Sequence, residues 1–78
     1  MKLKIYTLRK PTFKKDVDLI NLKTIVGELT ILENHCPYLT FLDKGQIKIS
    51  GHEGKETFEV NGGILEVLPG SRVNILAD

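Results

Sequence analysis

Apolar and polar residues alternate along most of the chain, in short runs that turn residues separate. In residues 2–8, Leu3 and Ile5 fall on one side of an extended chain, and the lysines before and between them fall on the other. No run keeps the period of 3.6 residues that an amphipathic helix shows. The pattern therefore predicts an all-β fold, a sandwich or barrel of short strands. The predicted strands are residues 2–8, 12–14, 16–24, 29–32, 38–42, 46–50, 56–60, 64–68 and 72–76.

In two of these runs the alternation also predicts which side chains are buried. Residues 16–24 have apolar side chains at both alternations, which predicts a strand with neighbours on both faces for part of its length. Residues 46–50 alternate cleanly, which places Ile47 and Ile49 inside.

Glycine and proline mark the turns. Pro69-Gly70 predicts a type II turn, because proline sets the first φ and glycine takes the positive second one. Gly51 and Gly54 flank a predicted hairpin loop. Asn34 and Pro37 bound an elbow that neither neighbouring strand can enter, since proline has no amide hydrogen and asparagine tolerates a left-handed turn.

Length and composition limit the possibilities. Seventy-eight residues predict a single domain, residues 1–78, and 41% hydrophobic and 27% charged residues are ordinary for a globular protein. No apolar run approaches the roughly 18 residues of a membrane span, and no signal peptide is expected. The single cysteine, Cys36, has no partner for an internal disulfide, and we expect it to be a small packed residue.

Charge is unevenly distributed although the net charge is only +1. Residues 1–15 hold six basic residues and no acidic one. One interpretation is that these residues solubilise exposed or edge strands. The other is that they meet an anionic partner or a lipid surface.

Candidate chemistry is sparse. One cysteine and two histidines do not supply the four ligands of a structural zinc site, so no metal is expected. His35 and Cys36 are adjacent on an extended chain and would point to opposite faces, which argues against a catalytic pair. Gly54-Lys55 is followed by Glu56 rather than by serine or threonine, so it is not a phosphate loop. We expect no catalytic residues, no cofactor and no nucleic-acid partner.

The stretch from Gly27 to Gly45, GELTILENHCPYLTFLDKG, contains spaced motifs that resemble one known family. They are Gly27-Glu28, the Asn34-His35-Cys36-Pro37 elbow, Leu39-Thr40 and the glycine of the following turn. Residues 62–67 (GGILEV) and 73–78 (VNILAD) agree with the same family. The chain thus resembles, over nearly its whole length, the epsilon subunit of the F-type ATP synthase, which mitochondrial nomenclature calls delta.

The resemblance implies a flattened β-sandwich of about ten short, mostly antiparallel strands. It implies a non-catalytic subunit of the central stalk, which couples rotation of the proteolipid ring to the catalytic head through gamma during proton- or sodium-coupled ATP synthesis. Its place would be peripheral, at the cytoplasmic face of the plasma (inner) membrane. By the same resemblance, Glu28 would contact the proteolipid ring, and His35 and Thr40 would contact gamma. Exposed apolar residues would supply most of that affinity, either Leu39 and Phe41 or, on the other face, Tyr38 and Leu42.

Two points separate the chain from the family pattern. Lys44 stands where the family commonly has proline, which loosens that turn. Family members typically continue, after the residues that match 76–78, into a helical hairpin, so we expect neither hairpin-type inhibition nor an ATP site in these 78 residues. The alternative hypothesis is that the chain is a free-standing small β-module that binds a ligand or nucleic acid. Such a module could also be a carrier whose attachment lysine would be Lys44 or Lys55.

Overall fold

The computed structural model describes residues 1–8, 10–33 and 35–78. Arg9, which lies between the first two predicted strands, and Asn34, where a turn was expected, lie outside the described residues. All the regular structure in the described residues is β, which confirms the predicted fold class, with nine strands where about ten were expected. The strands are β1 (Lys2–Thr7), β2 (Phe13–Asp16), β3 (Leu19–Thr24), β4 (Gly27–Leu32), β5 (Tyr38–Leu42), β6 (Gly45–Gly51), β7 (Gly54–Val60), β8 (Gly63–Leu68) and β9 (Arg72–Ala77).

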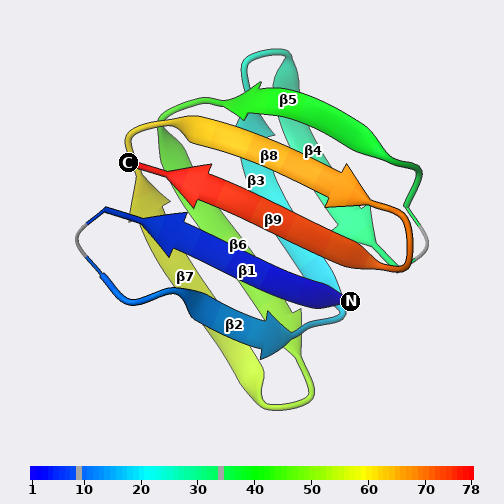
Figure 1. Cartoon of the computed structure of the whole chain (residues 1–78). Helices are drawn as coiled ribbons and strands as arrows, with labels where there is room; N and C mark the ends of the chain where they lie inside the picture. Colours follow the sequence, from blue (N-terminus) through cyan, green and yellow to red (C-terminus); the bar gives the residue numbers. More distant parts are fainter. Residues whose placement is uncertain (9, 34) are drawn as a thin grey trace.

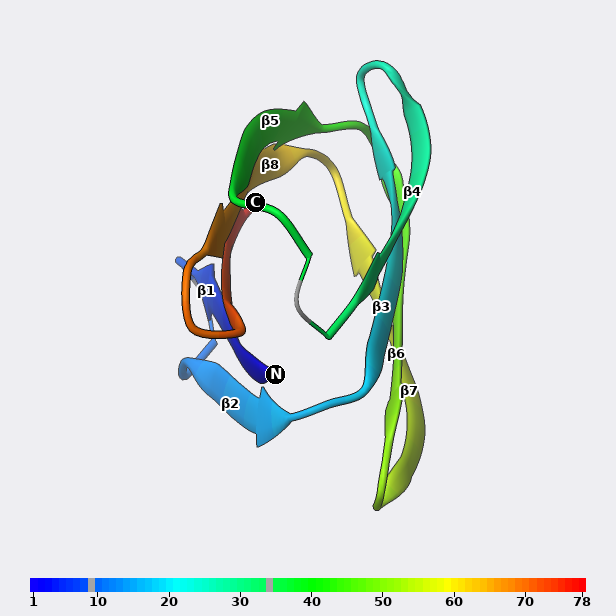
Figure 2. The ribbon, with the colours of Figure 1, turned by 90° about the vertical axis from the view of Figure 1, so that its right-hand side faces the viewer.

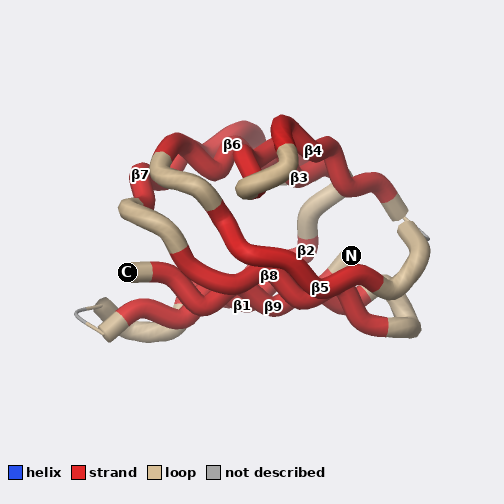
Figure 3. Tube along the Cα trace, turned by 90° about the horizontal axis from the view of Figure 1, so that it is seen from above, coloured by secondary structure: helices blue, strands red, loops and turns tan. Residues whose placement is uncertain are grey.

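The strands form two layers (Figures 1 and 2). The layer that we call the front sheet has the order β2-β1-β9-β8-β5, and the back sheet has the order β4-β3-β6-β7. Seen from above, the two sheets lie one over the other as a sandwich (Figure 3). Strand pairing continues between the layers at one corner, where Thr24 of β3 pairs with Leu42 of β5. Neighbouring strands are antiparallel except β1 and β9, which are parallel.

The core lies between the sheets because each strand buries every second side chain. Ile47 and Ile49 of β6 are buried, as their alternation predicted, and Ile75 of β9 is fully buried. Burying an aliphatic side chain of this size contributes roughly 1.5–3 kcal/mol, so about a dozen such residues dominate the stabilisation. The buried apolar residues are Met1, Leu3, Ile5, Val17, Ile20, Leu22, Ile31, Leu42, Ile47, Ile49, Val60, Leu65, Val67, Val73, Ile75 and Ala77.

The prediction of one continuous strand over residues 16–24 is wrong. β2 ends at Asp16, β3 begins at Leu19, and the chain passes from the front to the back sheet between them. The crossing is fixed by main-chain hydrogen bonds from the amides of Val17 and Asp18 to the carbonyls of Met1 and Ser50. Val17 and Ile20 are therefore both buried, which their odd spacing would forbid in one straight strand.

Side chains close the side of the sandwich where the edge strands β2 and β7 lie. The rings of Phe13 and Phe58 meet edge to face with centroids 4.9 Å apart. The ammonium of Lys15 lies 3.2 Å from a carboxylate oxygen of Glu56 and 3.6 Å from one of Glu53. The two sheets are thus held together here without main-chain pairing between β2 and β7.

Gly63 begins β8 where that strand lies directly against β9. Its φ is +151°, and a Cβ atom at this position would overlap the carbonyl oxygen of Leu76. Glycine is therefore required both by the backbone conformation and by the space. The predicted type II turn agrees with a φ of +81° at Gly70, and Ser71 adds a second positive φ of +54°.

Candidate partner interface

The two outer faces of the sandwich differ in chemistry. On the back sheet, the strand register places Thr30, Asn21, Lys48 and Thr57 in one row across β4, β3, β6 and β7. Every side chain in that row is polar, which suits a face in contact with water.

The front sheet carries an apolar row in the corresponding position. Register places Phe41 opposite Ile64, Ile64 opposite Leu76, and Leu76 opposite Tyr6, across β5, β8, β9 and β1. These four side chains, which we call the apolar row, are 59%, 38%, 50% and 38% exposed in that order. Leu39 is 68% exposed two residues before Phe41, on the same face of β5.

Polar groups border the apolar row. In the next register row, Glu66 of β8 lies opposite Asn74 of β9, and Asn74 lies opposite Lys4 of β1. The Asn74 amide donates a hydrogen bond to a carboxylate oxygen of Glu66 at 3.4 Å. A contiguous exposed apolar patch with a polar rim is typical of a protein-binding surface.

The sequence offered two apolar pairs as contributors to a partner contact, and in the structure Leu39 and Phe41 are both exposed. Leu42, in the other alternative, is buried in the core. Ile64, Leu76 and Tyr6 belong to the same surface and were not predicted from the sequence. The alternation within each strand predicts which face its side chains occupy. Only the pairing of strands that are distant in sequence brings these three side chains into one row.

Glu28 lies at the start of β4, on the outer face of the back sheet, opposite Lys23 of β3. Its carboxylate accepts a hydrogen bond of 3.0 Å from the side-chain amide of Asn21. The neighbouring β3–β4 turn exposes Ile25 and Val26 by 61% and 76%. Glu28 therefore has an exposed, partly oriented carboxylate beside an apolar turn.

His35 lies in the segment between β4 and β5, at the opposite end of β4 from Glu28. Its Nδ1 atom is 2.8 Å from the carbonyl oxygen of Cys36, so the Nδ1-protonated form donates to that oxygen. Its ring centroid lies 6.4 Å from that of Tyr38. The structure thus brings His35 next to β5 and leaves Glu28 apart from it.

Thr40 is half-buried in β5, where it pairs with Leu65 of β8. Because it shares its side of the strand with buried Leu42, it points away from the face that carries Leu39 and Phe41.

Cys36, which we expected to be packed, is exposed. It lies in the elbow, outside the strands that bury the core. Lys44 lies in a turn and Lys55 inside β7.

The described residues contain no group of three or more histidine, cysteine, aspartate or glutamate side chains that could hold a metal ion. Within the same part of the chain, no helix has the length and apolar character needed to cross a membrane.

Three titratable groups interact near the start of β1. The Met1 ammonium lies 3.1 Å from a carboxylate oxygen of Asp16 and 3.2 Å from one of Glu33, and it donates to the carbonyl oxygen of Val17 at 2.8 Å. Burial lowers the pKa of this ammonium, but the hydrogen bonds and negative charges of Asp16 and Glu33 outweigh that effect and raise it above its usual 8.0. The hydrogen bond to the ammonium in turn holds the pKa of the Glu33 carboxyl below its usual 4.5.

A family model described as the β-sandwich domain of the ATP synthase delta/epsilon chain matches residues 1–78. An ATP synthase epsilon chain of Roseiflexus sp. is 42% identical over 76 residues, which are 97% of this chain and 54% of that protein. An epsilon chain of Propionigenium modestum, named as sodium ion specific, is 32% identical over 99% of this chain and 56% of its own length. The chain thus spans about half the length of the curated relatives it matches.

Chains of solved ATP synthase structures share the fold. A chain of the Euglena gracilis mitochondrial ATP synthase (OSCP/F1/c-ring) superposes with a TM-score of 0.87, at 22% identity, over 96% of this chain and 48% of that one. A chain of the Tetrahymena thermophila mitochondrial ATP synthase (central stalk and c-ring) gives a TM-score of 0.83, at 22% identity, over 97% and 61%.

Proposed function

This chain belongs to the family of ATP synthase delta and epsilon chains, and from that premise we propose that it is a non-catalytic rotor component of an F-type ATP synthase. In this role it joins the gamma subunit to the proteolipid ring, at the cytoplasmic face of the plasma membrane. Rotation of the ring, driven by protons or sodium ions, then reaches the catalytic head through gamma. The chain needs no catalytic residue or cofactor of its own for this work.

The observation that carries the proposal is the apolar row on the front sheet. Specific protein interfaces bury about 800 Å² on each partner, which is roughly 15% of the 5249 Å² that this chain exposes. A patch of four cross-strand apolar side chains with a polar rim is suited to the centre of such an interface. We therefore assign this face to gamma.

Glu28 suits the second contact, with the proteolipid ring. Its carboxylate is exposed, and the side chain of Asn21 holds it in place from the neighbouring strand. An exposed ion pair contributes only about 0–1 kcal/mol, so we expect this contact to set orientation more than affinity. Ile25 and Val26, at the same end of the back sheet, add apolar area beside it.

His35 and Thr40 remain proposed gamma contacts with unequal support. The His35 ring is half-buried beside Tyr38, in the segment that leads into β5, so a partner that extends past the start of that strand would contact it. The Thr40 side chain is half-buried on the opposite face of β5 from Leu39. To contact Thr40, gamma would therefore have to reach around the edge of that strand.

Torque transmission requires a body that does not shear. The two sheets share a close-packed core, and side-chain contacts between β2 and β7 close the side opposite the β3–β5 corner. Sliding one sheet over the other would break these contacts together, which supports a role as a rigid connector.

The test is binding to the gamma subunit from the same organism, measured by calorimetry. We expect the double variant Phe41→Ser/Leu76→Ser to bind at least about 100-fold more weakly than the wild type, since central apolar residues of an interface each contribute about 2 kcal/mol or more. The matched control is Lys48→Ser/Thr57→Ser on the outer face of the back sheet, which should bind as the wild type does.

The outcomes separate the two parts of the proposal. A folded wild-type chain that does not bind gamma contradicts the rotor function. A wild type that binds, together with a folded Phe41→Ser/Leu76→Ser variant of equal affinity, contradicts the assignment of the front sheet and leaves the function standing.

A further inference from the structure

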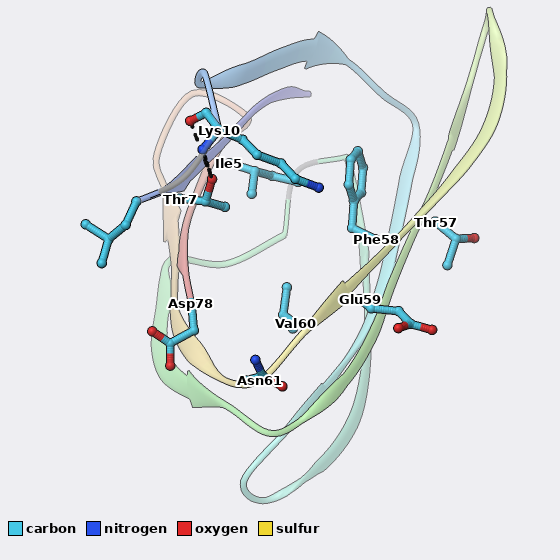
Figure 4. A pocket seen from close by; sticks show the side chains of 10 residues that line it. Ile5, Thr7, Lys10, Thr57, Phe58, Glu59, Val60, Asn61 and Asp78 are labelled. Carbon is cyan, nitrogen blue, oxygen red and sulfur yellow. Dashed lines mark hydrogen bonds between the residues drawn. The ribbon is translucent and has the colours of Figure 1, made fainter.

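A cavity that is not part of either proposed contact lies between the sheets, near the ends of β1 and β7 (Figure 4). Its volume is about 440 Å³, within the roughly 300–1,000 Å³ of sites that bind small molecules. Ile5 and Val60, both buried core residues, form its floor, and the half-buried ring of Phe58 forms a wall. An apolar molecule in this space would therefore extend the hydrophobic core.

One cationic side chain reaches into this space. The side chain of Lys10 extends across the opening toward Phe58 (Figure 4). The main chain of Lys10 is held by Thr7, whose hydroxyl accepts a hydrogen bond from the Lys10 amide at 3.2 Å and lies 3.5 Å from the Lys10 carbonyl oxygen. Lys15 on the nearby edge strand is neutralised by two glutamates, whereas within the described residues no carboxylate pairs with the Lys10 ammonium.

The acidic residues that border the cavity do not face it. Glu59 alternates with Phe58 and Val60 along β7, so its carboxylate lies on the outer face of the back sheet. In Figure 4 the carboxylates of Glu59 and Asp78 both point away from the space that Lys10 crosses. Of the charged side chains that line the cavity, the ammonium of Lys10 is therefore the one that extends across it.

We propose that this cavity binds a small amphipathic anion, namely an aliphatic monocarboxylate of about six to ten carbons, with its tail against Ile5, Phe58 and Val60 and its carboxylate paired with Lys10. The site gives a specific role to one member of the basic segment, residues 1–15. It is separate from the apolar row and from Glu28, so it does not depend on the proposed rotor function.

The experiment is a titration of the ¹⁵N-labelled chain with octanoate, followed by amide chemical shifts, below the concentration at which octanoate forms micelles. We expect saturable shifts confined to the ends of β1 and β7 and to the Lys10 turn. Affinity should rise about fourfold for each added methylene, so octanoate should bind roughly 15-fold more tightly than hexanoate. Octylammonium, with the same tail and the opposite charge, should bind at least about tenfold more weakly.

Variants distinguish the built site from general adsorption. Lys10→Met keeps the length of the side chain and removes its charge, and it should weaken octanoate binding about tenfold. Lys14→Met removes an equal charge from the exposed face of β2 and should leave octanoate binding unchanged. The proposal is overturned if no saturable shifts appear, if octylammonium binds as well as octanoate, or if Lys10→Met binds octanoate with unchanged affinity.

Discussion

Phe13 of β2 and Phe58 of β7 pack edge to face across the two sheets, with ring centroids 4.9 Å apart and ring planes at 66°. Neither strand forms main-chain pairs with the other, so this contact joins two free sheet edges. Lys15 adds ion pairs to Glu53 and Glu56 on the same side.

We therefore expect Phe58→Ala to destabilise the fold by about 2–3 kcal/mol, somewhat less than for a fully buried phenylalanine. The measurement is the free energy of unfolding in urea. Thr57→Ala, on the outer face of the same strand, is the control and should change stability by less than about 0.5–1 kcal/mol. Equal effects of the two variants would mean that the aromatic contact does not hold the sheets together.

Gly63 offers a second test, of the backbone rather than of side-chain packing. We expect Gly63→Ala to destabilise the protein by about 3 kcal/mol or more, because the added Cβ overlaps the Leu76 carbonyl oxygen and the φ of +151° is strained for alanine. Gly54, whose φ is +114° but whose Cβ position is open, separates the two effects. Thermal unfolding should show a much smaller loss for Gly54→Ala, and similar losses in both variants would exclude the overlap as the cause.

Ile75 and Leu76 are adjacent on β9 but face opposite ways, one into the core and one into the apolar row. Ile75→Ala should cost about 2–5 kcal/mol of stability, since it opens a cavity in the core. Leu76→Ala should cost less than about 1 kcal/mol, because its side chain is 50% exposed. Chemical denaturation of the two variants measures this directly. A large loss in Leu76→Ala would show that the apolar row stabilises the isolated chain rather than waiting for a partner.

The contact between the Met1 ammonium and Glu33 predicts a pH dependence with a definite sign. The pKa of Glu33 is lowered by folding, so its contribution is present above the unfolded pKa near 4.5 and is lost as pH falls through the lower folded pKa. The pKa of the ammonium is raised, so its contribution is present below 8.0 and is lost as pH rises through the higher folded pKa.

Urea midpoints measured from about pH 3 to about pH 10 should therefore fall at both ends of that range. Glu33→Gln, which keeps the shape of the side chain, should reduce the fall on the acidic side. Identical acidic limbs for the variant and the wild type would contradict a native role for the ion pair.

The alternation of apolar residues was sufficient to predict most of the strands. Ile47 and Ile49 were placed correctly because β6 is straight and has one buried face. Prediction failed between Asp16 and Leu19, since a corner that passes between sheets shifts the alternation, and that shift depends on partners as distant as Ser50.

The candidate interface was predictable only in part, for a related reason. Leu39 and Phe41 could be proposed from one strand, but Tyr6, Ile64 and Leu76 join them through strand pairings that no local pattern specifies. Cys36 was misplaced because its small apolar side chain gives no local signal to separate an exposed elbow from a packed strand.

The parallel pairing of β1 with β9 has a consequence for how the chain acquires its structure. Lys2 is paired with Arg72 and Thr7 with Ala77, so the first strand to leave the ribosome finds its central neighbour only when almost all of the 78 residues have been made. Until then β1 can pair only with β2, and the two halves of the front sheet have no strand between them. Such non-local pairing makes folding slow, so the nascent chain would expose the apolar faces of β5 and β8 while it waits for its last strand.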